Sequence, residues 1–155
     1  MRIRSIVSLA ASAVAVLALA TPSQAVGNGY YLIRDAESGT CLNAGGGALG
    51  GQLGDCGQES AWRVVNLPDG SVLFREANDE SRCLGLSPLK IFPPAVAESE
   101  CGNAPDRWLV NGPSSGEPVA LSLKGLASIG TLTSRGDRAT LAGEGEREWD
   151  LVRVG

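Results

Sequence analysis

The chain contains no histidine among its 155 residues, and this absence removes the commonest route to catalysis. A serine or cysteine nucleophile is usually activated by a neighbouring imidazole that takes its proton. Histidine is also a principal zinc ligand, and no cysteine pair here has the close spacing of a zinc knuckle. Acid pairs such as Glu98/Glu100 are typical of solvated turns. We therefore expect a protein that is not an enzyme and that needs no metal or cofactor.

Basic residues are also scarce. Lysine and arginine number 13 against 17 acids, the formal net charge is −4, and the positive residues form no runs. Nucleic-acid phosphates and anionic membrane surfaces are bound by clusters of lysine and arginine. The composition therefore excludes both as expected partners.

A long apolar run occurs only at the N-terminus, over residues 6–20. Arg2 and Arg4 precede it, and small residues up to Ala25 follow it at the positions that a signal peptidase reads. The run is short for a membrane span. The pattern predicts a signal peptide over residues 1–25 and one secreted, monomeric domain over residues 26–155.

Three tryptophans, rare and bulky, close three stretches of similar length. Trp62, Trp108 and Trp149 each lie in an apolar setting, which indicates one core position used three times. The repeats span about residues 30–70, 71–112 and 117–154. The first and second copies each contain two cysteines, and the third contains none. We align residues 125–129 of the third copy with the segment that holds the first cysteine in the other two copies.

Short apolar runs bounded by glycine, proline, asparagine and aspartate predict strands throughout. The 21 glycines and 8 prolines leave no convincing helical period. Three four-stranded units that close around a pseudo-threefold axis form an all-β β-trefoil. Closure covers the apolar face and the strand edge that each unit alone leaves bare.

Four cysteines allow three pairings, which sequence alone does not distinguish. Cys41 and Cys56 occupy the places in copy one that Cys83 and Cys101 occupy in copy two. Equivalent positions suggest equivalent bonds, so we expect Cys41–Cys56 and Cys83–Cys101, and disulfides fit an oxidising compartment.

These motifs resemble the ricin B-type lectins, whose repeats carry a Cys-Leu-Asp-like segment, a second cysteine and a closing Gln-x-Trp. The matching residues are Cys41-Leu42-Asn43, Cys83-Leu84-Gly85, Cys56, Cys101, Trp62, Trp108 and Trp149. The resemblance implies a β-trefoil in which each repeat can hold a shallow sugar pocket.

Such a pocket needs an aromatic ring that stacks on the sugar and polar groups that fix its hydroxyls. The family's acid position corresponds to Asn43, Gly85 and Ser128, and its aromatic position to Gly54, Ser99 and Leu141. No ring stands at these places, so the implied sugar sites are altered. The candidate carbohydrate-binding residues are those clustered in the first repeat: Asn43, Gln52 and Asp55.

Other aromatic residues are candidates for the missing ring. Tyr31 and Phe74 match the first core strand, whereas Tyr30 can face solvent. Phe92 lies in an apolar, proline-rich loop that either forms a recognition surface or tucks beneath the barrel. The alternative function is therefore a secreted protein that binds a protein partner, for example as a protease inhibitor, through loops 44–51 and 90–94.

The tripeptide Arg135-Gly136-Asp137 matches a short motif read by integrin-like receptors. Short motifs recur by chance, and a glycine between polar residues is typical of a hairpin tip. We interpret this segment as a turn.

Overall fold

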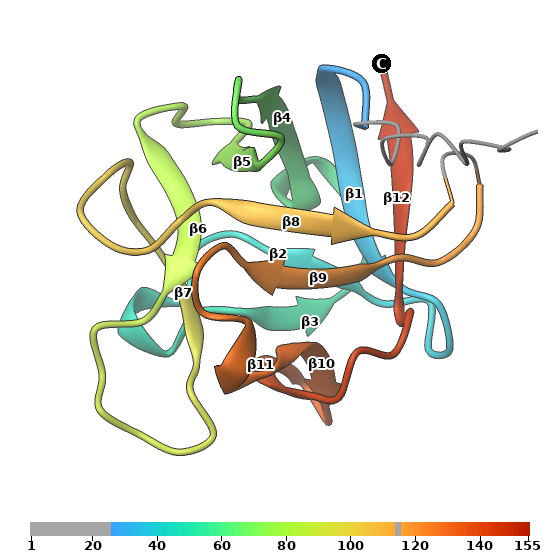
Figure 1. Cartoon of the computed structure of the whole chain (residues 1–155). Helices are drawn as coiled ribbons and strands as arrows, with labels where there is room; N and C mark the ends of the chain where they lie inside the picture. The colour runs from blue at the N-terminus through green and yellow to red at the C-terminus, as the bar shows by residue number, and fades with distance from the viewer. Residues whose placement is uncertain (1–25, 114–115) are drawn as a thin grey trace, which may run out of the picture.

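The computed structural model of the chain describes residues 26–113 and 116–155. The predicted signal peptide lies outside these residues. The all-β expectation is confirmed, since the described residues form twelve strands and three short 3-10 helices (Figure 1). The strands are β1 (Gly29–Asp35), β2 (Cys41–Asn43), β3 (Gln52–Gly54), β4 (Ala61–Asn66), β5 (Val72–Glu76), β6 (Arg82–Leu86), β7 (Val96–Glu100), β8 (Trp108–Asn111), β9 (Ala120–Leu123), β10 (Thr131–Arg135), β11 (Arg138–Gly143) and β12 (Trp149–Val154); the helices are η1 (Gly47–Leu49), η2 (Gln58–Ser60) and η3 (Ala127–Ile129).

Six strands close into a barrel. β1 pairs with both β12 and β4, β4 pairs with β5, β5 with β8, and β8 with β9. A bridge between Val119 and Trp149 joins the β9 and β12 ends of the ring. Closure leaves no unpaired sheet edge along the barrel, which is the physical reason that a repeat of this size is used three times.

The other six strands form three hairpins, β2–β3, β6–β7 and β10–β11. The hairpins meet one another at one end of the barrel: β11 pairs with β3 at Arg138 and Gln52, and Ala95 bridges to Thr140. Gly51 marks this close approach, because a Cβ there would lie 2.7 Å from the Val96 side chain. Its φ of +71° also favours glycine. Barrel plus three capping hairpins is the β-trefoil architecture.

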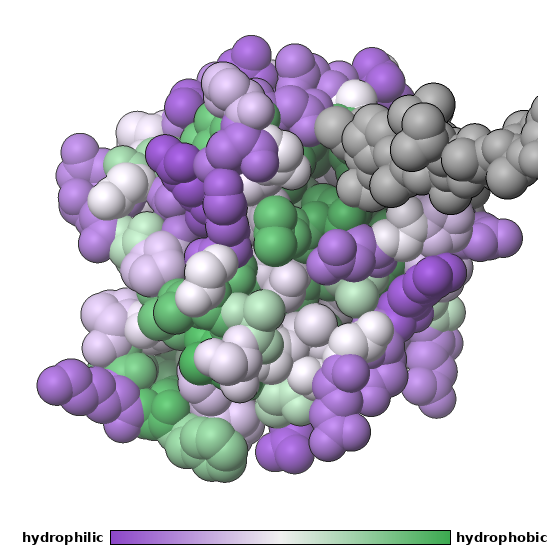
Figure 2. Space-filling model, viewed as in Figure 1, coloured by the Kyte–Doolittle hydropathy of each residue, from purple (hydrophilic) through white to green (hydrophobic). Residues whose placement is uncertain are grey.

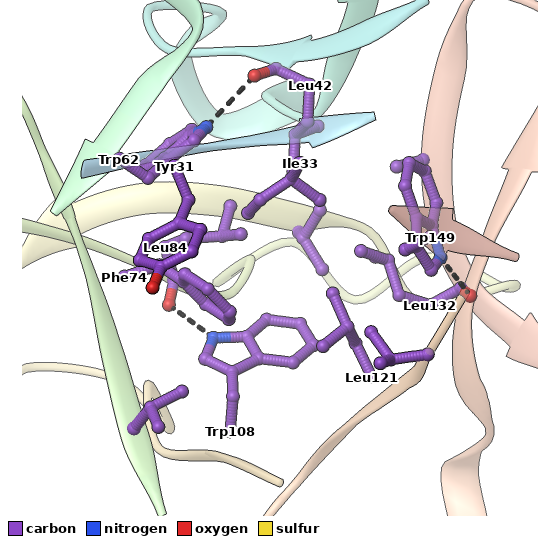
Figure 3. Packing of buried hydrophobic residues seen from close by; sticks show 14 of the residues in the cluster. Tyr31, Ile33, Leu42, Trp62, Phe74, Leu84, Trp108, Leu121, Leu132 and Trp149 are labelled. Atoms are coloured by element: carbon purple, nitrogen blue, oxygen red, sulfur yellow. Dashed lines mark hydrogen bonds between the residues drawn. The ribbon is translucent and has the colours of Figure 1, made fainter. Parts of the chain in front are cut away.

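The three tryptophans lie in one buried core (Figure 3). Each indole is fully buried, and each indole Nε1–H donates to a leucine carbonyl oxygen: Trp62 to Leu42 at 2.9 Å, Trp108 to Leu84 at 2.8 Å and Trp149 to Leu132 at 2.8 Å. Tyr31 and Phe74 belong to the same core. A buried indole needs such an acceptor, so the bond fixes each tryptophan against the first strand of its own hairpin.

These bonds correct the alignment of the third repeat. The partner of Trp149 is Leu132, so the counterpart of Cys41-Leu42-Asn43 is Thr131-Leu132-Thr133, and Ser128 is not the equivalent of Asn43. Ser128 is an exposed residue of η3, which precedes the strand. The indole N–H donates to a carbonyl of the hairpin strand itself. Residues 125–129 have a similar apolar sequence but lie before that strand.

Two disulfides join Cys41 to Cys56 and Cys83 to Cys101, so each bond stays inside one repeat. In the third repeat a hydrogen bond takes this place. Thr131, the counterpart of the first cysteine, accepts at its Oγ1 the backbone N–H of Gly145 at 3.1 Å. The hairpin end that is covalently closed in two repeats is thus held by one hydrogen bond in the third.

The helices among residues 26–113 and 116–155 are all too short or too polar to cross a membrane.

Candidate functional site

The sequence-predicted polar residues of the first repeat lie on β2, β3 and the turn that follows. Asn43 and Gln52 are directly opposite each other in the β2–β3 register, and Gln52 is in turn opposite Arg138 of β11. Cross-strand partners place their side chains on the same face. Gln52 and Asp55 are exposed, whereas Asn43 is half-buried.

Asn43 is held by its own repeat. Its side-chain Oδ1 is hydrogen-bonded to the Ser60 hydroxyl, which also accepts the Gly57 N–H at 3.1 Å. Ser60 stands two residues before Trp62, at the glutamine position of the family motif. A Cβ on Gly54 would lie 2.9 Å from Asn43 Nδ2, so the amide fills the space of the missing side chain. The Asn43 amide therefore braces the hairpin, and the free polar groups here are Gln52 and Asp55.

The equivalent positions of the other repeats also serve the fold. A Cβ on Gly85 would lie 2.5 Å from the Pro105 carbonyl oxygen, which is backbone and has little freedom to move, so no side chain fits there. In the third repeat Thr133 Oγ1 donates to Glu148 Oε1 at 2.9 Å. The position after the Cys-Leu pair thus has no room for a side chain in the second repeat, and in the third its threonine hydroxyl is bonded within the chain.

A concave surface is present at a different place, where the three hairpins meet. We call this the cap pocket; it has a volume of about 360 Å³. Every repeat contributes to it, and its lining is Leu49 and Gly50 from the β2–β3 connection, Ile91, Phe92, Pro93 and Ala95 from the β6–β7 connection, and Arg135, Arg138, Ala139 and Thr140 from β10 and β11.

Hydrogen bonds fix the walls of the cap pocket to one another. Ser87 Oγ donates to the Ala48 carbonyl oxygen at 2.6 Å, which ties the β6–β7 connection to η1. The Arg138 guanidinium donates to the Leu49 carbonyl oxygen. The Ala139 N–H donates to the Gly51 carbonyl oxygen at 2.7 Å. Because the three hairpins are mutually bonded, the pocket is formed before any ligand arrives.

Phe92 projects into solvent at the rim of this pocket, with 95% of its surface exposed. Leu49 and Ile91 are 44% and 45% exposed beside it. Figure 2 shows hydrophobic residues gathered over the connection between β6 and β7, at the lower left of the view. The structure therefore decides between the two interpretations of this loop: it forms an exposed surface and does not tuck beneath the barrel.

The other ring that reaches solvent is less available. Tyr30 is 40% exposed, and its hydroxyl donates to Glu80 Oε1 at 3.2 Å. Phe92 is thus the aromatic side chain, among the described residues, with the most open face. Sequence reasoning named its loop but gave no indication that residues of all three repeats surround it.

The rim also carries positive charge. Arg135 and Arg138 are opposite each other at the end of β10–β11, and the two-residue turn between them is Gly136-Asp137. The tripeptide at 135–137 is therefore a hairpin turn, as the sequence indicates. Arg135 is exposed and Arg138 half-buried, and Lys90 is exposed in the neighbouring β6–β7 connection.

A buried carboxyl group supports the loop below the cap pocket. Glu98 is not the solvated-turn residue that its sequence suggested: it lies on β7, is 7% exposed, and its Oε1 accepts the Gly45 N–H at 3.0 Å. Burial is the main cause that raises the pKa of Glu98 above its ordinary value, and the nearby charge of Glu76 adds to it. Burial thus penalises the ionised form of Glu98 more in the folded chain than in the unfolded one.

We expect the Glu98→Gln variant to melt at a higher temperature than the wild type at neutral pH, and the difference to vanish below about pH 4. The pKa of Glu98 is higher in the folded than in the unfolded chain, so the wild type gains stability as the pH falls through that raised pKa. The amide keeps an oxygen for the Gly45 N–H. Thermal melts across this pH range test this, with the exposed Glu100→Gln as control. A glutamine variant that melts lower at neutral pH would contradict it.

Solved structures share the fold, and ThreeFoil and SeviL are two of them. The designed 3-fold symmetric protein ThreeFoil matches with a TM-score of 0.63 and 18% sequence identity, over 81% of this chain and 99% of its own. SeviL, solved bound to the asialo-GM1 saccharide, matches with a TM-score of 0.62 and 18% identity, over 83% of this chain and 100% of its own. No protein-family model matches the chain, and no curated protein matches it in sequence. At this identity the likeness shows the fold, and the predicted β-trefoil is confirmed.

Proposed function

We propose that this chain is a secreted, non-catalytic carbohydrate-binding module that holds a sugar at the cap pocket. The observation that carries the proposal is the open ring of Phe92 beside hydrogen-bonding side chains in a preformed hollow. These are the two kinds of group that a shallow sugar site requires. A β-trefoil of similar shape is known with a bound saccharide, and the two disulfides are consistent with an extracellular protein.

The polar residues predicted from the first repeat fit this location in part. Gln52 is opposite Arg138 in register, and Arg138 lines the pocket, whereas Gln52 itself is not among the lining residues. In this proposal the sugar ring stacks on Phe92, and the side chains of Arg138 and its register partner Gln52 bind the sugar hydroxyls. Asn43 is opposite Gln52 and stabilises the β2–β3 hairpin through its bond to Ser60. Asp55 is a peripheral contact in this proposal.

We expect the Phe92→Ala variant to lose glycan binding by about tenfold or more, because the stacked ring is the largest apolar contact. The measurement is a glycan array followed by titration calorimetry on residues 26–155. Tyr30→Ala is the matched control, since it removes the other exposed ring away from the pocket. Equal binding by Phe92→Ala and wild type would reject the cap pocket, and no signal from any glycan would reject the function.

A protein partner is the second candidate, favoured by the exposure of Leu49 and Ile91 beside Phe92. Three neighbouring apolar side chains on loops are typical of a protein contact. The notable case is a protease inhibitor that presents residues 90–94. Inhibition assays against a panel of secreted proteases test it directly. Inhibition by the wild type that is lost in a chain lacking residues 91–94 supports this candidate, and unimpaired inhibition by that chain rejects the loop.

A further inference from the structure

We infer that the cap pocket selects saccharides that carry a carboxylate. The inference rests on the proposed function of the same pocket, and it names the class of sugar. Three observations carry it: two arginines opposite each other on one hairpin, the lack of a carboxylate partner for them within the described chain, and an exposed aromatic ring in the lining of the same pocket.

The two arginines flank the shortest turn between paired strands among the described residues. Arg135 and Arg138 flank the turn Gly136-Asp137 and are opposite each other in register, so their side chains leave the same face of the hairpin. Both line the cap pocket. Arg138 uses one guanidinium nitrogen to donate to the Leu49 carbonyl oxygen, which orients the group and leaves its other N–H donors available.

Two like charges opposite each other across a hairpin destabilise it unless an anion lies between them. The ion pairs formed within residues 26–113 and 116–155 lie elsewhere and engage neither Arg135 nor Arg138. Asp137 is exposed in the turn itself and also forms no ion pair with them within these residues. An acidic chain thus leaves two of its arginines together at a hollow without a carboxylate partner, which is the arrangement of an anion site.

The remaining lining indicates that the anion belongs to a sugar. Phe92 offers a flat apolar face, and Leu49 and Ile91 extend that face. A small inorganic anion would gain nothing from these residues. A sugar acid places its ring carbons on Phe92 and its carboxylate on the guanidinium forks, whose planar donors match a carboxylate in a bidentate manner. The volume of about 360 Å³ is at the small end for ligand pockets, and suits one or two sugar rings.

The experiment compares pairs of saccharides with and without a carboxylate; the trigalacturonate pair differs in the charged group alone, whereas the two sialylated pairs differ by a whole sialic acid residue. Titration calorimetry on residues 26–155 uses 3′-sialyllactose against lactose, GM1 against asialo-GM1 saccharide, and trigalacturonate against its methyl ester. A sulfated disaccharide forms a separate arm. We expect the carboxylated member of a pair to bind about tenfold or more tightly, and added salt to weaken it.

Variants assign the effect to the two arginines. Arg135→Gln is the main variant, because Arg135 is exposed and holds no other loop. We expect the ratio of the Kd values for the neutral and the carboxylated sugar to fall about tenfold in this variant. Arg147→Gln removes an exposed arginine outside the pocket and serves as the charge-matched control, which we expect to bind like the wild type. Thermal melts of all variants verify that they are folded.

The possible outcomes test the carboxylate preference, the location of the site and the proposed function separately. Neutral sugars that bind as well as their acidic partners overturn the carboxylate preference and leave the proposed function standing. Sulfated and carboxylated sugars that bind alike overturn the carboxylate assignment in favour of any anionic sugar. Loss of preference in Arg147→Gln as well as Arg135→Gln overturns the location. Absence of binding to every sugar removes the proposed function and this inference with it.

Discussion

We expect the free energy of unfolding to fall by about 3–5 kcal/mol in the Trp62→Ala variant. The indole is fully buried in the shared core, so truncation leaves a cavity that three interlocked repeats have little freedom to fill. The variant also leaves the Leu42 carbonyl oxygen without its donor. Chemical denaturation, followed by circular dichroism, measures the loss.

Two comparisons make the result specific. Trp62→Phe retains much of the packed ring but has no N–H, so we expect a smaller loss than with alanine. Arg63→Ala changes the next residue, which is exposed, and we expect little effect. An unchanged midpoint for Trp62→Ala would mean that the indole does not fill the core.

Removal of the second disulfide, in the double variant Cys83→Ala/Cys101→Ala, costs about 3 kcal/mol. The bond closes a chain segment with a sequence separation of 18, and its loss releases that segment in the unfolded state. Alanine is the suitable replacement because Cys83 is fully buried, and a serine hydroxyl would need a partner there.

The third repeat provides the reference for this experiment. Thr131→Ala removes the hydrogen bond that Gly145 makes at the place of the missing disulfide, and we expect a loss of about 1 kcal/mol. Denaturation curves of both variants give the two values. An equal loss of stability in the two variants would mean that the disulfide stabilises its repeat no more than the hydrogen bond stabilises the third one.

The fold could be predicted because its strongest signals are buried and repeated. A tryptophan in a closed core tolerates few substitutes, so Trp62, Trp108 and Trp149 keep the period visible even where other letters have changed. The register of the third repeat could not be predicted, because the cysteines that mark the hairpin strand in the first two repeats are absent from it. The bond from Trp149 to Leu132 sets the true register, and a backbone carbonyl leaves no trace in the sequence.

The candidate site was less accessible to prediction. The family pattern points to Asn43. Its amide is hydrogen-bonded to the Ser60 hydroxyl and packs against Gly54 within its own repeat. The cap pocket instead gathers Leu49, Phe92 and Arg135 from three distant segments. One signal was available: the loops at 44–51 and 90–94 and the turn at 136–137 each join the two strands of a hairpin, so threefold symmetry brings them together.

The convergence of three hairpins has a consequence for stoichiometry. A site on the flank of each repeat is copied when the repeat is copied, whereas the place where all repeats meet exists once per chain. The three connections differ in length and sequence, so the cap pocket is asymmetric: the second repeat contributes an aromatic ring and the third contributes two arginines. Each chain therefore binds one ligand at this place. Any gain in avidity must come from several chains held side by side on a surface.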